Sequence, residues 1–148
     1  MLRRKYHIHA ATGFRRMAMR AVIFSIVFTA ALPYAVSGGP AMARSGAIRP
    51  DGILEFVRSD GAILATIDIE IAETAETRRS GLMGRTGLHM TDGMLFIFEQ
   101  AEQRSFWMYN TPLSLDMIFV DSEKRIVHIV ESALPMSTQT YDSRFPAR

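Results

Sequence analysis

The chain of 148 residues contains no cysteine. It therefore cannot form disulfides, use a thiol nucleophile, bind a metal through thiolates or carry a lipoprotein-type anchor. It also lacks an apolar run of about 20 residues, the length that a membrane-spanning helix needs. Without disulfides, any folded domain of this chain must be stabilised by an apolar core. About 100 residues are enough to form one independent domain.

Acidic residues are absent from residues 1–43. This segment has six basic side chains among its first twenty residues, then an almost wholly apolar stretch at 21–36, and then Ala41-Met42-Ala43. Basic, apolar and small residues in that order are typical of a secretory signal peptide. We expect cleavage after Ala43 and a periplasmic or secreted protein. The alternative is an inner-membrane protein that is anchored by residues 21–36.

The charge balance changes at the end of this leader. Residues 44–148 contain eleven Lys and Arg against fifteen Asp and Glu, a net charge of −4, whereas the whole chain carries +2. The basic character of the whole chain therefore comes from the leader alone. An acidic domain is a poor partner for phosphates, so we expect no nucleic-acid partner.

Residues 44–51 contain Ser, Gly and Pro and predict a linker, which leaves residues 52–148 as a single β-rich domain. Apolar and polar residues alternate along 65–71, as in a strand with one buried face. Asp60-Gly61, between two apolar runs, predicts a hairpin turn. The other predicted strands lie at 53–57, 94–98, 105–109, 115–121 and 125–131.

One helix is predicted, from Thr74 to about Met83. Thr74 is a favourable N-cap, and Gly84 can provide the left-handed residue that ends the helix. Gly81 would then lie inside the helix, which suggests close approach of another backbone. The fold class is mainly β (α+β): a small barrel-like or sandwich-like domain of about six strands, with one helix packed on it. The core residues that we expect are Ile67, Ile69, Phe96, Phe98, Ile118 and Phe119.

Four motifs occur in order: Arg79-x-Gly81-Leu82-Met83, Gly93-Met94-Leu95-Phe96, Phe106-Trp107-Met108-x-Asn110-Thr111 and Leu115-Asp116-x-Ile118-Phe119. Through them, residues 52–146 resemble the bacterial and archaeal family known as domain of unknown function 192. The resemblance implies a small, often exported β-rich domain, and no activity is established for the family. Its members usually continue past the position of Arg148 with a further strand, so the resemblance implies that this last strand is lacking here.

Five residues are candidates for a ligand-binding cleft. Trp107 would form an apolar wall, Asn110 and Asp116 would supply hydrogen bonds, and Arg79 or Arg85 would bind an anion in a bidentate manner. The same residues also fit structural roles. Trp107 could belong to the core, Asn110 and Asp116 could brace the turn between them, and an arginine could pair with Asp116.

Three functions remain open. The favoured one is a non-catalytic exported accessory domain that binds a small ligand or an envelope partner, without a cofactor. The second is a small hydrolase-like enzyme that uses Asp116 with Arg79 or Asn110. The third is a copper-handling protein that uses His89 and thioethers, from Met83, Met90, Met94, Met108, Met117 and Met136. The sequence assigns no catalytic or metal-binding residue, and it does not define the ligand, the oligomeric state or the start codon.

Overall fold

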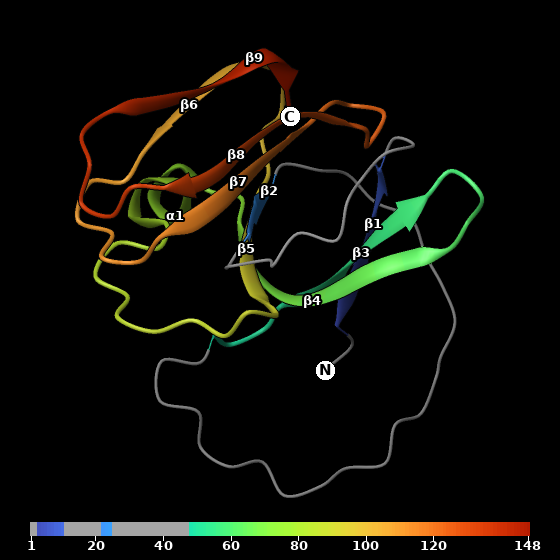
Figure 1. The fold of residues 1–148 in the computed structure, drawn as a ribbon, viewed down its shortest axis with the longest axis horizontal. Coiled ribbons are helices and arrows are strands. Elements are labelled where there is room, and N and C mark those ends of the chain that lie inside the picture. Colours follow the sequence, from blue (N-terminus) through green and yellow to red (C-terminus); the bar gives the residue numbers. More distant parts are fainter. Residues whose placement is uncertain (1–2, 11–21, 25–47) are drawn as a thin grey trace, which may run out of the picture.

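The computed structural model describes residues 3–10, 22–24 and 48–148, which form nine strands and one short helix. Seven strands form one sheet in the order β1-β3-β4-β5-β2-β7-β8, and β6 and β9 form a second sheet (Figure 1). The elements are β1 (Arg4–Ala10), β2 (Val22–Phe24), β3 (Gly52–Arg58), β4 (Ile63–Ala72), α1 (Ala75–Ser80), β5 (Asp92–Phe96), β6 (Glu102–Trp107), β7 (Leu115–Val120), β8 (Ile126–Ala133) and β9 (Thr140–Ala147).

The prediction of a mainly β domain with one helix is confirmed. The two sheets do not close into a barrel within the described residues, and the strands exceed the predicted six because three lie where none was expected. One of these is β9. The other two, β1 and β2, lie inside the predicted leader. No helix in the described ranges is both long and apolar enough to cross a bilayer.

β1 and β2 join the large sheet through parallel pairing. β1 pairs with β3, and Tyr6 and Ile8 are buried in the core. β2 lies between β5 and β7 and pairs with both. The cleavage site that we expect at Ala43 lies outside the described residues, so processing of the leader stays a prediction.

The β3–β4 hairpin forms at the predicted turn. Gly61 has φ 85°, which favours glycine, and its N–H donates to the carbonyl of Arg58 at 2.9 Å. In β4 the alternation places Ile67 and Ile69 in the core. Of the other predicted core residues, Phe96, Ile118 and Phe119 are buried and Phe98 is partly buried.

The helix begins as predicted but ends earlier. Thr74 is the N-cap, and its side chain accepts the N–H of Thr77 at 3.1 Å while its own N–H donates to the Thr77 hydroxyl at 3.0 Å. The predicted end at Met83 is wrong, because α1 ends at Ser80 and Gly81 is the C-cap with φ 47°. What approaches Gly81 closely is the ring of Phe96: a Cβ at Gly81 would lie 3.3 Å from its Cζ.

α1 and the β6–β9 sheet both lie beside the second of two clusters of buried apolar residues, the one that contains Phe96 and Phe119. Leu82, directly after the helix, is buried there with Phe96, Met108 and Phe119, and Phe106 of β6 packs against them. Between α1 and β6 the surface is hollowed, and this hollow positions the candidate site.

Candidate functional site

A cleft of about 730 Å³ lies between α1 and β6. One side consists of residues 78–83, which are the end of α1 and the turn that follows it. The opposite side consists of residues 103–109, together with Thr111 and Leu115. Phe96 and Phe98, at the end of β5 and just beyond it, line the cleft between the two sides.

Aromatic side chains cover much of this surface. The rings of Phe106 and Phe98 lie edge to face with centroids 6.3 Å apart, and Phe106 contacts Phe96 in the same way at 5.1 Å. Trp107 and Tyr109 form a second pair, 5.2 Å apart and inclined by 33°, and each is 52% exposed. Exposed aromatic rings beside a concave surface can bind flat or apolar ligands.

Three arginines line the cleft, and no Asp or Glu of the described ranges does. Arg78 is fixed by the protein itself. Its guanidinium donates to the carbonyls of Glu73 at 2.6 Å and Ile97 at 2.8 Å, and it lies 5.1 Å from the Phe98 ring centroid. Arg78 therefore ties α1 to the segment after β5.

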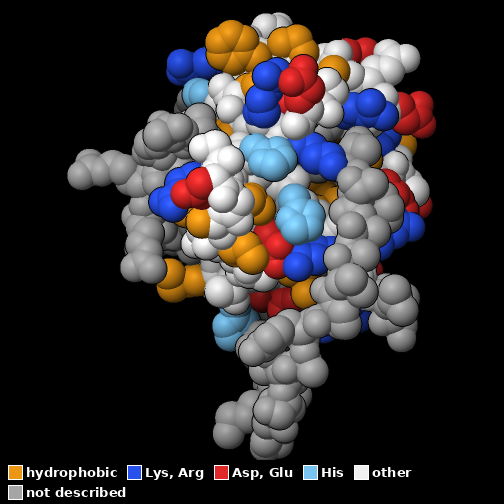
Figure 2. All heavy atoms as spheres, turned by 90° about the vertical axis from the view of Figure 1, so that its right-hand side faces the viewer, with side chains coloured by type: hydrophobic (Ala, Val, Ile, Leu, Met, Phe, Trp, Pro, Cys, Tyr) orange, Lys and Arg blue, Asp and Glu red, His pale blue; other side chains and the backbone are white. Residues whose placement is uncertain are grey.

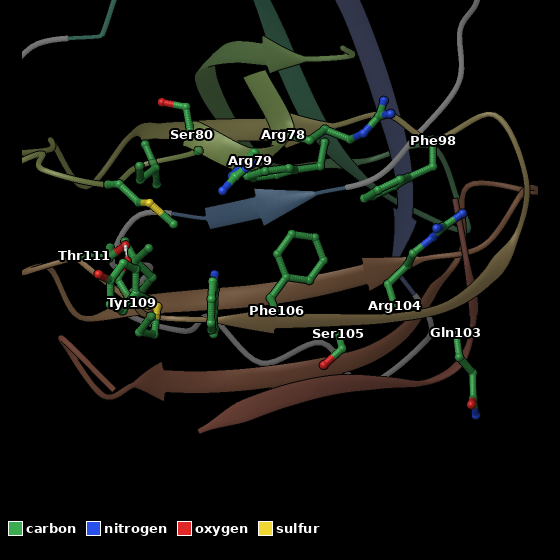
Figure 3. A pocket seen from close by; sticks show the side chains of 17 residues that line it. Arg78, Arg79, Ser80, Phe98, Gln103, Arg104, Ser105, Phe106, Tyr109 and Thr111 are labelled. Atoms are coloured by element: carbon green, nitrogen blue, oxygen red, sulfur yellow. Dashed lines mark hydrogen bonds between the residues drawn. The ribbon is translucent and has the colours of Figure 1, made fainter. Parts of the chain in front are cut away.

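Arg104 lies on the other side of the same ring. Its guanidinium is 4.1 Å from the centroid of Phe98, in the geometry of a cation–π contact, and it is paired with Glu102 at 3.2 Å. Its Nε is buried without a hydrogen-bond partner among the described residues. Figure 3 shows Arg78 and Arg104 on opposite sides of Phe98.

Arg79 differs from both. Its side chain is exposed and makes no hydrogen bond or ion pair with another described residue. In Figure 3 its side chain extends from α1 into the opening above Phe106. An arginine without a protein partner can use its whole planar set of donors on a ligand, and carboxylates and phosphates match that geometry.

The turn after β6 is held in place by its backbone. Asn110 has φ 50°, and its carbonyl accepts the N–H of Gly84 at 2.7 Å, which links the two sides of the cleft. The N–H of Met136 donates to the carbonyl of Thr111 at 2.9 Å. A non-glycine residue at positive φ persists only where its surroundings stabilise it, and such residues are common at functional sites.

The structure brings two of the five predicted site residues, Arg79 and Trp107, to one cleft. Asn110 lies in the adjoining turn, where its backbone carbonyl makes the contact with Gly84. Arg85 lies in another hollow, of about 1000 Å³, and pairs there with Glu70. Asp116 is buried in β7 and does not line the cleft. Its Oδ1 accepts the N–H of Ser132 at 2.7 Å.

This arrangement bears on the two alternative functions. Asp116 does not share a cavity with Arg79, as the hydrolase-like reading needs. Of the methionines, Met94, Met108 and Met117 are buried in the core, while Met90 and Met136 are exposed. The described ranges contain no group of three His, Asp or Glu side chains arranged to hold a metal ion.

The sequence reasoning missed Arg104, Phe106 and Tyr109 as residues of the cleft. Only Tyr109 had a signal in the sequence, because in the predicted strand at 105–109 it lies two residues from Trp107 and therefore on the same face. Between 103 and 109 every even-numbered residue is at least partly buried and every odd-numbered one is exposed. This alternation is visible only in the structure, because Phe106-Trp107-Met108-Tyr109 is a continuous apolar run in the sequence.

Two solved structures have a fold similar to that of this chain. A protein from Sinorhizobium meliloti 1021, described as a candidate transcription regulator, has a similar fold (TM-score 0.58, 36% identity, 62% of this chain and 70% of that one). A protein of unknown function from Novosphingobium aromaticivorans DSM 12444 is similarly related (TM-score 0.57, 31% identity, 62% of this chain and 64% of that one). No curated protein matches the chain.

The family comparison covers the cleft in full. Residues 55–148 match the family described as "Uncharacterized ACR". This range includes every residue on both sides of the cleft. The motifs that suggested the family thus lie in the matched region. The chain belongs to the domain of unknown function 192 (DUF192) family.

Proposed function

We propose that this protein is a non-catalytic binding domain whose cleft takes a small organic anion, a carboxylate or phosphate joined to an apolar or aromatic group. The observation that carries the proposal is Arg79. It lies in a cleft with an aromatic lining and no acidic residue, and it has no partner among the described residues. A charge-assisted hydrogen bond from arginine stabilises an anion by about 1.5–3 kcal/mol.

The rest of the cleft would bind the apolar part of the ligand. Trp107 and Tyr109 expose ring surface at its mouth, and Phe98 and Phe106 present ring edges and faces inside it. Arg78 and Arg104 add positive potential, but their donors already engage backbone carbonyls. We therefore assign recognition of the anion to Arg79. Arg78 would position α1, and Arg104 would position the ring of Phe98.

We also propose that the domain acts outside the cytoplasm after cleavage following Ala43, because residues 1–43 have the three regions of a signal peptide. Intact-mass measurement of the exported protein tests this directly. A mass that begins at Arg44 supports the proposal, and a mass that retains residues 21–43 contradicts it and favours an anchor.

A nucleic-acid role, which the description of the Sinorhizobium meliloti protein would suggest, is less favoured. Residues 44–148 carry a net charge of −4. Affinity for DNA or RNA depends mainly on neutralising phosphates with basic side chains. Three arginines in one cleft fit a single small anion better than a nucleic-acid backbone.

The cleft can be tested by fluorescence, because Trp107 is the only tryptophan of the chain. We suggest titration with 2-naphthoate and with its neutral counterpart, 2-naphthamide. The two have the same ring system, so their difference reports on the anion. We expect 2-naphthoate to bind about tenfold more tightly, and Arg79→Ala to abolish the difference.

Arg58→Ala is the matched control. Arg58 lies at the β3–β4 hairpin, on the far side of the molecule from α1 (Figure 1), where basic and acidic side chains intermingle (Figure 2). Its removal lowers the net charge by the same amount without touching the cleft, so the preference for 2-naphthoate should remain. Equal affinities for the two compounds in the unaltered protein would refute the proposal.

A further inference from the structure

β6 is an edge strand that borders the cleft. Within the described residues it pairs only with β9, so its second edge has no strand partner. An unpaired edge presents a row of backbone donors and acceptors, and such edges accept an additional strand when an extended segment approaches.

The cleft runs along this edge and not across one face of the strand. All seven residues from 103 to 109 line it. Successive side chains of a strand point to opposite faces, so a hollow over one face would be lined by alternate residues only. Here the residues of both faces of the strand line the cleft, so the edge of the strand borders it.

Two hydrogen bonds show which backbone groups face the cleft. The N–H of Arg104 donates to the Ser143 hydroxyl at 3.0 Å, and the N–H of Met108 donates to the carbonyl of Ser137 at 3.1 Å. Both partners lie on the β9 side. Because backbone groups alternate in direction along a strand, the N–H and C=O of Ser105 and Trp107 point to the other edge.

We infer that the natural ligand of the cleft is an extended peptide segment that adds to β6 as a further strand and places a carboxylate on Arg79. This inference rests on the proposed function and names the class of its ligand. The segment would exchange hydrogen bonds with Ser105 and Trp107. Its apolar side chains would alternate onto Phe98 and Phe106, and an aspartate, a glutamate or a C-terminal carboxylate would meet Arg79.

The dimensions and the charge fit such a segment. β6 has six residues, and at about 3.3 Å per residue a strand of that length spans about 20 Å. The arginines and the absence of acids among the described lining residues select an acidic segment over a basic one. The aromatic rings add apolar contact, which a segment of acids alone would not use.

The experiment uses a library of random heptapeptides with free C-termini, selected on the full-length protein and counter-selected on its Arg79→Ala variant. We expect the recovered sequences to share an acidic group at one position and apolar residues at every second position. Recovered sequences without this period, or recovery that is equal on both proteins, would overturn the inference.

Methylation of backbone nitrogens then tests strand pairing. Methyl groups on alternate amides of a recovered peptide remove donors and leave the side chains in place. Methylation of the amides that face β6 should lower affinity about tenfold or more. Methylation of the amides between them, which face away from β6, should change affinity little. Equal effects of both sets would mean that the peptide does not bind as a strand.

Ser105 provides the complementary variants. Proline at an edge position removes a donor that faces away from the ladder, so Ser105→Pro should keep the β6–β9 pairing and weaken peptide binding. Ser105→Ala keeps the backbone N–H, so any loss of affinity in Ser105→Pro beyond that of Ser105→Ala reports on the missing donor. If 2-naphthoate still binds through Arg79 while no peptide is selected, the peptide inference fails and the small-anion proposal stands. If neither binds, both fail.

Discussion

Arg78 and Arg79 are adjacent in the chain, but their guanidinium groups have different surroundings. Arg78 donates to two backbone carbonyls, whereas Arg79 has no partner in the described part of the chain. The sequence offered Arg79 or Arg85 for binding an anion, with a structural ion pair as the alternative for either. It could not show which charges the fold neutralises, because the carbonyl of Ile97 that binds Arg78 is nineteen residues away.

Asp116 illustrates the opposite outcome. It was a candidate for the cleft, but its carboxylate is buried and accepts the N–H of Ser132. We expect Asp116→Ala to lower the free energy of unfolding by about 1–3 kcal/mol, because removing a buried acceptor leaves its donors unpaired. Denaturant melts measure this. Affinity for 2-naphthoate should stay within twofold of the parent, and a large loss of affinity without loss of stability would return Asp116 to the binding site.

Asp60 gives a prediction for pH. Its carboxylate accepts from Arg58, the largest cause, and from the N–H of Ala62, and its pKa falls from 3.8 to about 2. Because the pKa of Asp60 is lower in the folded than in the unfolded state, its ionisation stabilises the fold fully at pH values above 3.8, the unfolded pKa. This stabilisation is lost as the pH falls through about 2, the folded pKa. An NMR titration of the Asp60 carboxyl should give a pKa near 2 in the parent. In Arg58→Ala it should return toward its ordinary value, and an unchanged pKa would contradict the pairing.

Among the elements, α1 was the easiest to predict at its start and the hardest at its end. The N-cap follows from one side chain, Thr74, which bonds within its own turn. The C-terminus depends on the Phe96 ring, which approaches Gly81 from a strand whose position the local sequence does not reveal.

Gly81 and Gly84 form a matched pair for testing this. Both have positive φ, 47° and 70°, but only Gly81 would bring a new Cβ to 3.3 Å from Phe96, since Gly84 has open space. We expect Gly84→Ala to cost about 1 kcal/mol for its backbone conformation. Gly81→Ala should cost clearly more because the ring must also move. Equal unfolding midpoints for the two variants would show that Phe96 does not restrict this turn.

β9 was missed because its sequence does not resemble a half-buried strand. Of its eight residues only Ser143 and Ala147 are buried, and neither is a strongly apolar side chain. Its pairing with β6 is a long-range property of the fold. The remaining strands after residue 52 were predictable, because they have either a period of two or continuous apolar runs.

For the molecule as a whole, the sequence was sufficient for the fold class and the family but not for the site. Arg79 and Trp107 were identified from their motifs, whereas Arg85 and Asp116 were grouped with them because all four lie in the same stretch of motifs. Proximity in sequence is a weak guide in a β-rich protein, since neighbouring residues of a strand point to opposite faces.

The pairing of β1 with β3 in the large sheet predicts that the N-terminal segment contributes to stability. Tyr6 and Ile8 are buried against β3 and its neighbours. Full burial of such a side chain contributes about 1.5–3 kcal/mol. A chain that begins at Arg44 lacks β1 and also β2, which pairs with β5 and β7. It should therefore unfold at a lower denaturant concentration than the unprocessed chain.

Binding provides the control for this comparison. All described residues of the cleft lie between 78 and 115, so both chains should bind 2-naphthoate with similar affinity. Coincident unfolding curves would mean that β1 and β2 together contribute nothing to stability.

The most direct measurement of the central claim, that Arg79 and the aromatic cleft bind an anion, is an NMR titration of the arginine side-chain Nε–Hε signals with 2-naphthoate. We predict that the Arg79 signal shifts with saturation, that Arg104, stacked on Phe98, shifts less, and that Arg58 does not move. The same titration with 2-naphthamide should shift Arg79 less, and only at about tenfold higher concentration. A titration in which Arg85 shifts and Arg79 does not, or in which no arginine responds, would contradict the account.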